Sequence, residues 1–263
     1  MSKSIQTKIY IVNTMCYESE VNKMKSTARD FSNETITKVV RIIGDRHTEI
    51  VSNGSARVKV IDKGNHKTGV NIPVFNLPPI VTCGGNCWAC KSKCYAVKDY
   101  VNYRVKAVST NHVRNMVALQ TDFDKAFADL DKWLTRHKPN FFRVHASGDF
   151  GLILGGDKFK YARMWEELAK RHPETCFLAF TKCYDIAREV KFDELPNFEL
   201  VLSEWTDVLV APEDLKKRYR TSRAVNEISD AHDNEMICPG NCDTCGMCWN
   251  LSKTGHDVAF EIH

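Results

Sequence analysis

The chain has 263 residues, of which 43% are hydrophobic and 27% charged, and its formal net charge is +4. This is the composition of an ordinary globular protein with enough residues for a sizeable core, so we expect a fold that needs no cross-links. The weak positive charge permits an anionic partner such as nucleic acid without requiring one. No apolar stretch approaches the ~18 residues of a membrane-spanning helix, and the first residues lack the pattern of a secretory signal. We therefore expect a cytoplasmic protein with reduced cysteines and no membrane partner.

Residues 1–70 have only a weak pattern, and we treat them as an amino-terminal segment without an assigned role. In this segment we expect a strand at 8–12, a patchy helix over 21–43 that the residues Ser32–Thr35 interrupt, a strand at 56–62, and a turn-rich loop at 63–69.

After residue 70 the pattern sharpens into alternating strands and helices. We expect strands at 71–75, 141–149, 175–182, 198–205 and 257–263, and helices at 95–120, 123–136, 157–172 and 185–195. Such alternation predicts an α/β fold, with a partial (β/α) barrel or a mainly parallel sheet. We divide this part into an α/β core at 71–225 and a carboxy-terminal segment at 226–263 that holds the closing strand.

Polar side chains follow three of the predicted strands, where ligands gather in such folds. These side chains belong to Ser147, Asp149, Thr181, Lys182, Ser203 and Glu204. The ends of strands are also polar simply because they reach water, so each residue alone fits both interpretations.

The cysteines gather in two loops. The first loop reads Cys83-x3-Cys87-x2-Cys90-x3-Cys94, and the second reads Cys238-x3-Cys242-x2-Cys245-x2-Cys248. They share the pattern C-x-G-N-C-x-x-C, which is typical of a metal-binding turn because glycine allows unusual backbone angles and close approach. Eight cysteines of the odd total of eleven lie here, which argues against a disulfide framework in a reducing compartment.

The spacing within each loop favours an iron–sulfur cluster over zinc. Structural zinc takes two ligand pairs separated by a longer excursion, whereas each loop here carries four cysteines within a few residues of one another. The spacing is close to that of bacterial ferredoxins without matching it. A zinc site, including one shared by the two loops, stays as an alternative.

The triad Cys83, Cys87 and Cys90, after the predicted strand at 71–75, resembles the cluster motif of the radical S-adenosylmethionine superfamily. The turn Ser147-Gly148-Asp149 after the next strand is similar to the Gly-Gly-Glu turn of that superfamily, and the second cysteine loop resembles its auxiliary-cluster segments. The resemblance covers about residues 70–250. The layout of paired cysteine loops around an R-x-H-x-S-G-D strand also resembles a family of uncharacterised phage-encoded proteins.

The first resemblance implies two [4Fe-4S] clusters and bound S-adenosylmethionine. The reduced first cluster would split that cofactor into methionine and a 5′-deoxyadenosyl radical, which abstracts hydrogen from a substrate, after a flavodoxin or ferredoxin has supplied the electron. The resemblance assigns Ser147, Gly148 and Asp149 to the amino group of the cofactor. Position at the strand ends makes Lys182 a candidate for its carboxylate, and Ser203 or Glu204 for its ribose. No catalytic residue is assigned.

The sequence departs from the superfamily pattern at three places. Ala89 replaces the usual aromatic residue before the third cysteine, the turn is Ser-Gly-Asp, and Cys94 is an extra thiol. If Cys94 binds iron, the first cluster is closed by four thiolates and serves electron transfer or redox-sensitive binding instead. If the following helix turns Cys94 away, an iron stays open. A zinc-stabilised nucleic-acid-binding module is the third function considered, with the basic run at 214–223 as its contact or as a solvated helix face.

Three further residues have two interpretations each. His145 alternates with Arg143 along the strand at 141–149, so it either faces a substrate or is a hydrogen-bonded core histidine. Cys176 fits a small buried hydrophobic residue, and Cys183 fits an inert thiol better than a third reactive site.

Overall fold

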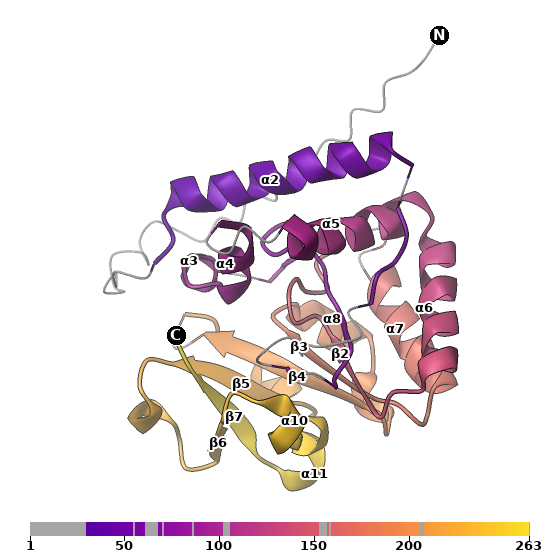
Figure 1. The fold of residues 1–263 in the computed structure, drawn as a ribbon. Coiled ribbons are helices and arrows are strands. Elements are labelled where there is room, and N and C mark those ends of the chain that lie inside the picture. The colour runs from indigo at the N-terminus through magenta and orange to yellow at the C-terminus, as the bar shows by residue number, and fades with distance from the viewer. Residues whose placement is uncertain are drawn as a thin grey trace.

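The computed structural model describes residues 30–54, 56–60, 68–69, 71–85, 87–101, 106–152, 157, 159–205 and 208–262. Their centre is a seven-stranded sheet in the order β1-β2-β3-β4-β5-β7-β6, in which every neighbouring pair is parallel. The strands are β1 Val74–Phe75, β2 Phe141–Val144, β3 Cys176–Thr181, β4 Phe198–Trp205, β5 Arg220–Val225, β6 Glu235–Ile237 and β7 Asp257–Glu261. The predicted α/β class with a parallel sheet is confirmed (Figure 1).

Ten α-helices are described, with three short 3-10 turns. The helices are α2 Asn33–Ser52, α3 Trp88–Ser92, α4 Tyr95–Val101, α5 Lys106–Thr121, α6 Phe123–His137, α7 Lys160–Arg171, α8 Tyr184–Glu189, α9 Glu213–Lys216, α10 Cys242–Cys245 and α11 Leu251–Thr254. The 3-10 turns are η1 Phe192–Glu194, η2 Ile228–Asp230 and η3 Met247–Asn250. Figure 1 shows α2 lying across α5, and α6 and α7 standing beside the sheet. Among the described residues, none of the helices combines the length and the apolar character needed to cross a bilayer.

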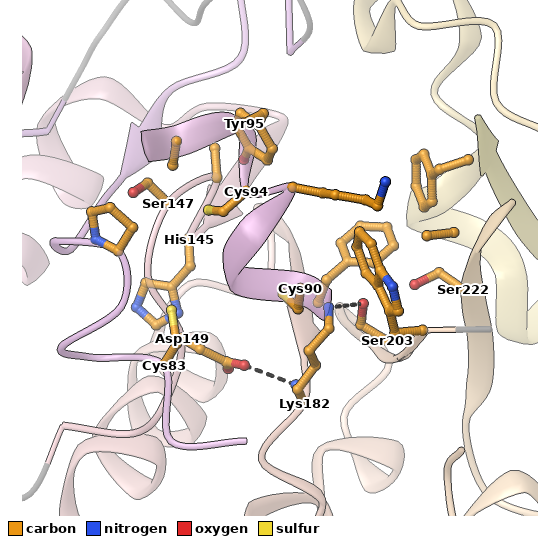
Figure 2. Close-up of a pocket in the computed structure, with 18 of the residues that line it drawn as sticks. Cys83, Cys90, Cys94, Tyr95, His145, Ser147, Asp149, Lys182, Ser203 and Ser222 are labelled. Carbon is orange, nitrogen blue, oxygen red and sulfur yellow. Dashed lines mark hydrogen bonds between the residues drawn. The ribbon is translucent and has the colours of Figure 1, made fainter. Parts of the chain in front are cut away.

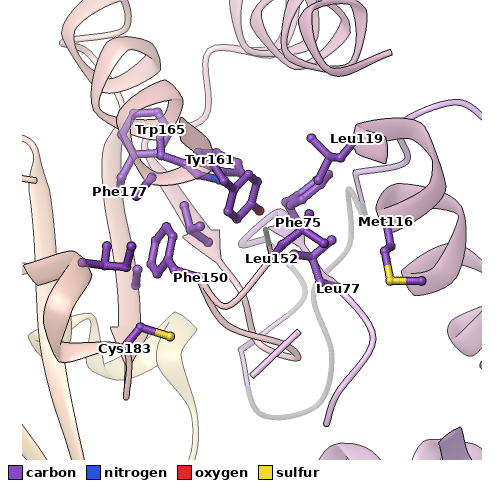
Figure 3. Close-up of a cluster of buried hydrophobic side chains, with 14 of the residues drawn as sticks. Phe75, Leu77, Met116, Leu119, Phe150, Leu152, Tyr161, Trp165, Phe177 and Cys183 are labelled. Carbon is purple, nitrogen blue, oxygen red and sulfur yellow. The ribbon is translucent and has the colours of Figure 1, made fainter. Parts of the chain in front are cut away.

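The two faces of the sheet bury different sets of side chains because successive residues of a strand point to opposite sides. On the helical face, Phe142, Phe177 and Leu200 pack with the helices into the main core. This core includes the fully buried Trp165 and Tyr161 of α7 (Figure 3). Arg143, Leu178, Phe180 and Val201 point to the opposite face, which we call the inner face.

The carboxy-terminal segment covers the inner face. Trp249 and Leu251 pack against Leu178 and Val201, and the Trp249 ring lies 5.1 Å from that of Phe141. Strands β6 and β7 extend the same sheet beyond β5. The described residues 226–262 of the predicted carboxy-terminal segment therefore contribute two strands and a covering layer to the sheet.

Several predicted elements are confirmed with small shifts at their ends. The strands at 141–149, 175–182, 198–205 and 257–263 correspond to β2, β3, β4 and β7, and the helices at 123–136 and 157–172 to α6 and α7. In α6, Phe127, Leu130 and Leu134 are buried. The long helix at 95–120 comprises α4 and α5 with residues between them outside the described part, and 185–195 comprises α8 and η1.

Three predictions about elements were wrong. Asn33, Glu34 and Thr35 do not interrupt a helix but form the first turn of α2, and the Ser32 side chain caps that turn by accepting a hydrogen bond from Thr35 N. Residues 21–29 of the expected helix lie outside the described part of the chain. Residues 56–60 form no strand, because Lys59 bonds through its backbone to the side-chain amide of Asn115 instead of to another strand. The basic run at 214–223 contains α9 and the start of β5, a strand that its polar residues concealed. The expected strand at 8–12 lies outside the described residues.

Candidate functional site

A cavity of about 300 Å³ lies on the inner face, at the carboxyl ends of the strands. Both cysteine loops reach it: Cys83, Cys90 and Cys94 line it from the first, and Cys238, Cys242 and Cys248 from the second. Figure 2 shows the first three around this cavity, with Lys182 and Ser203 beside them. The two cysteine loops, which are about 150 residues apart in the sequence, therefore meet at one site in the fold.

The first loop is held against the sheet by glycines. A Cβ atom on Gly85 would lie 2.9 Å from the backbone nitrogen of Cys183 and closer still to the carbonyl of Lys182. Gly151 N donates to Thr82 O at 3.0 Å, and a Cβ atom on Gly151 would overlap Thr82 and Gly84. The loop thus packs backbone against backbone onto the end of β3, which fixes the positions of its thiols.

The turn Ser147-Gly148-Asp149 lines the cavity, and its side chains also hold the turn in place. The Ser147 hydroxyl donates to Leu77 O at 3.0 Å. Gly148 has φ of +84°, and a Cβ atom there would lie 2.7 Å from Leu77 Cβ and Thr82 Oγ1, so only glycine fits.

The Asp149 carboxylate is buried and accepts three hydrogen bonds. They come from Phe150 N at 2.7 Å, Thr181 Oγ1 at 2.7 Å and Lys182 N at 2.8 Å. Burial raises the pKa of this carboxyl, and the three donors oppose that effect. Asp149 thereby ties the end of β2 to the end of β3.

Lys182 and Ser203 form a polar pair on the cavity wall, whereas Glu204 is engaged elsewhere. Lys182 Nζ donates to Ser203 Oγ at 2.6 Å. Desolvation lowers the pKa of Lys182, but the thiols of Cys90 and Cys83 and the Asp149 carboxylate raise it to a net value above the usual one. Glu204 lines the cavity, yet one of its oxygens accepts from Ala211 N at 2.9 Å and lies 3.1 Å from Lys216 Nζ.

The second loop surrounds a small cavity of its own. Cys238, Cys242, Cys245 and Cys248 all line it. Cys238 N donates to Ala259 O at 2.9 Å at the end of β6, and the Asn241 side chain accepts from Asp243 N to start α10. The turn then closes at Gly246, whose φ is +61°. The four thiols of this loop thus face a common space.

Arg143 stands beside the second loop, and sequence reasoning did not select it. Its guanidinium lies 4.1 Å from the Phe180 ring centre, and Nε donates to His145 O at 3.3 Å. Burial lowers its pKa, while Tyr95 and the thiols of Cys242 and Cys248 counteract this effect. The available signal was an arginine within an apolar strand, since a charged side chain there needs a polar space on one face.

Burial raises the pKa of thiols in both loops. The pKa of Cys83 is raised well above its usual value by desolvation, then by Asp149 and Cys94. Desolvation and Cys90 raise the pKa of Cys94 to about 12, and desolvation raises that of Cys248 to about 12 although Arg143 lowers it. Thiolates at these positions therefore need a cation to stabilise them.

His145 does not share the inner face with Arg143, because its φ of +61° turns the side chain back toward the helices. Its Nε2 shares a hydrogen bond of 2.6 Å with Tyr161 Oη, and its ring packs on Phe150. Burial lowers its pKa to about 3. The interpretation as a hydrogen-bonded core histidine therefore fits, although the residue also touches the cavity.

The ten cysteines that the structure describes are thiols, and the eleventh, Cys16, lies outside the described residues. Cys183 is buried in the main core, and Cys176 is half-buried at the start of β3. Within the described ranges, no three histidine, cysteine or acidic side chains stand close enough to hold a single metal ion.

A comparison with family models matches residues 51–251 to the family described as Gene product 88. No curated protein and no solved structure matches the chain. The family match fits the looser resemblance to a phage-encoded family. Because it spans more than half of the chain, this protein belongs to the Gene product 88 family.

Proposed function

We propose that this protein binds two [4Fe-4S] clusters, one at each cysteine loop, and is a radical S-adenosylmethionine-type enzyme. One observation carries the proposal: the two sets of thiols line a single cavity together with the basic residues Lys93, Lys98, Arg143 and Lys182. Lys93 pairs with Asp30, but among the described residues no carboxylate lies within ion-pair distance of Arg143 or Lys182.

The two cations fit an anionic cofactor. A cation removed from water without a counter-charge is costly. Lys182 has a partial counter-charge in the Asp149 carboxylate, whereas only a tyrosine and cysteine thiols raise the pKa of Arg143, so Arg143 in particular fits an anion that shares its site. A cubane cluster held by cysteine thiolates carries net negative charge at a site of this kind. Lys182 lies within electrostatic range of Cys83 and Cys90, and Arg143 within that of Cys242 and Cys248. Each loop therefore has a cation of its own.

The spread of the thiols favours a cluster over zinc. A tetrahedral zinc ion with Zn–S bonds of about 2.3 Å holds its sulfurs about 3.8 Å apart. The described cysteines line two cavities without any grouping at single-ion distances. A cluster of four irons has a wider footprint, which agrees with thiols arranged around a space.

The strand order supports the cofactor assignment. The first thiols follow β1, the Ser147-Gly148-Asp149 turn follows β2, and Lys182 follows β3, in five sequential parallel strands. A reduced cluster with one open iron would supply an electron to the sulfonium of S-adenosylmethionine, which releases methionine and a 5′-deoxyadenosyl radical that takes hydrogen from a substrate. The protein would bind and orient the cofactor and exclude water from it.

The residues predicted for S-adenosylmethionine fit it unequally. The Ser147 oxygen and the backbone of Gly148 face the cavity and suit its amino group, while Asp149 positions the turn through Thr181. Lys182 suits its carboxylate, and Ser203, which already accepts a hydrogen bond from Lys182, suits its ribose better than Glu204 does. A flavodoxin or ferredoxin in a reducing cytoplasm would supply the electron.

Anaerobic purification and iron–sulfur reconstitution test the proposal. We expect a brown protein that absorbs near ~400 nm and holds about eight iron atoms per chain, as two cubanes require. Dithionite and S-adenosylmethionine should change its paramagnetic resonance signal and release 5′-deoxyadenosine. A brown protein without this response would support electron transfer or redox-sensitive binding, and a colourless zinc protein would refute the proposal.

A further inference from the structure

The four thiols of the first loop do not point the same way. Cys83, Cys90 and Cys94 line the cavity, and Figure 2 shows them on its wall. Cys87 does not line it. The residue is 3% exposed and packs in a small apolar cluster with Ala89 and Trp205, against which Cys90 also lies. Its thiol is still close enough to raise the pKa of Lys182.

The local backbone explains this difference. Cys87 precedes the first residue of α3 in an extended conformation, with φ of −99° and ψ of 171°, and its carbonyl accepts from Lys91 N at 3.1 Å. Cys90 follows within the single turn of α3, and the chain then turns at Lys93. Cys94 therefore comes back beside Cys90, and the thiols of Cys83, Cys90 and Cys94 are electrostatic neighbours of one another.

Backbone N–H groups also act on two of the cavity thiols. Those of Val97 and Ala96 lower the pKa of Cys94, and that of Ile80 lowers the pKa of Cys83. The Val97 N–H itself donates to Cys94 O at 3.1 Å. Ile80 has φ of +70°, a conformation that a β-branched residue adopts only when its surroundings enforce it. N–H groups directed at cysteine sulfurs are a recurring means of stabilising an iron–sulfur cluster.

We propose that Cys83, Cys90 and Cys94 hold the first cluster and that Cys87 is not an iron ligand, so that one iron stays open toward the cavity. This inference rests on the proposed function and departs from the superfamily resemblance, which makes Cys87 a ligand and Cys94 the extra thiol. An iron without a cysteine ligand would be left in the cavity that Ser147 and Gly148 also line. The extra cysteine of this sequence then does not close the cluster, because it takes the place of Cys87.

The test measures iron and sulfide per chain after reconstitution of Cys87→Ala, Cys94→Ala and, as control, Cys183→Ala. Cys183 is another buried cysteine next to this loop, so its variant reports the effect of losing a buried thiol that binds no iron. We expect about eight irons in wild type, Cys87→Ala and Cys183→Ala, and about four in Cys94→Ala, because one cubane holds four irons. Circular dichroism of the apo-proteins shows whether each variant folds, and Cys87→Val replaces Cys87→Ala if the smaller side chain does not fill the space beside Trp205.

The outcomes separate the two proposals. A wild type without iron refutes the proposed function itself. If the wild type is loaded, four irons in Cys87→Ala and eight in Cys94→Ala overturn the inference in favour of the superfamily triad. If both variants lose four irons, the first cluster is closed by four thiolates. If neither variant loses iron, the cluster lies elsewhere. Each of these two results also overturns the inference. A changed paramagnetic resonance signal of loaded Cys87→Ala on addition of S-adenosylmethionine supports the open iron.

Discussion

Substitution of Gly85 tests whether the first loop must pack directly on the end of β3. A Cβ atom there would lie 2.9 Å from Cys183 N, and closer to the carbonyl of Lys182. An ordinary contact begins near 3.4 Å, so Gly85→Ala must move the loop by more than 0.5 Å. The obstacle is backbone and cannot rotate away. Overpacking of this kind costs about 2 kcal/mol, which corresponds to a factor of about 30 in the population of the native loop position.

The second loop provides a matched control, because Gly240 occupies the same place in C-x-G-N-C-x-x-C. A Cβ atom on Gly240 would meet nothing within 4 Å, but its φ is +81°. Gly240→Ala therefore costs only the strain of a left-handed alanine, about 1 kcal/mol, or a factor of about 5. Gly85 is required because the backbone of the first loop packs closely on the end of β3, whereas Gly240 is required because of its positive φ angle.

The assay is the iron content of each variant after reconstitution and gel filtration. We expect Gly85→Ala to retain about four irons per chain, those of the second cluster, and Gly240→Ala to retain about eight. The reasoning is refuted if Gly85→Ala keeps the full iron content of a loaded wild type, since the loop would then have room that the structure does not give it.

Three further predictions concern other charges. Arg143→Met should shift the second cluster to a more negative reduction potential in protein-film voltammetry, because a cation beside a cluster stabilises its reduced form; an unchanged potential would contradict this. Glu235→Gln should lower the free energy of unfolding in urea at pH 7 by about 3 kcal/mol, because it breaks a buried ion pair with Arg223 of 2.7 Å. Burial raises the pKa of Glu235, but Arg223 lowers it, and the net value lies below the usual one. The wild type should therefore lose the stabilisation from this ion pair as the pH falls through that pKa, and Glu235→Gln should not. His112 and His145 each have a pKa lowered to about 3 by burial, so the unfolded state binds their protons first, and each should lower stability by about 1 kcal/mol between pH 6.5 and 5.5; His112→Gln should remove about half of that slope.

The sequence predicted the part of the fold that apolar patterns encode. Strands β3 and β4 are nearly continuous apolar runs, as expected for strands buried on both faces. Strand β5 has the same parallel neighbours yet reads Arg-Thr-Ser-Arg-Ala-Val, because Ser222 and Ala224 face the cavity. A strand that lines a polar site has polar residues at the positions where other buried strands have apolar ones, so its sequence does not predict a strand.

The candidate site was predicted less completely than the fold. Cysteine spacing identified both loops, but the meeting of the loops depends on the sheet order, in which β6 follows β7. Asp149 was selected as a cofactor contact, and the sequence did not show that its carboxylate also ties the end of β2 to the end of β3. His145 was placed on the face of Arg143 because alternation assumes extended backbone, and a φ of +61° breaks it. The local sequence pattern does not encode the order of strands in the sheet, the hydrogen bonds between distant residues or a single positive φ angle.

The carboxy-terminal segment is bound to the centre of the sheet, which makes the second cysteine loop part of the core. Glu199 of β4 is a buried carboxylate that accepts from Ser252 N at 3.0 Å and Ser252 Oγ at 2.7 Å. Trp249 and Leu251 cover the apolar inner face beside it. Removal of this segment would expose that face and leave the carboxylate without these donors, at a cost of several kcal/mol. A chain without this segment should therefore unfold or aggregate, and the position of the second thiol set opposite the first follows from the same contacts that stabilise the sheet.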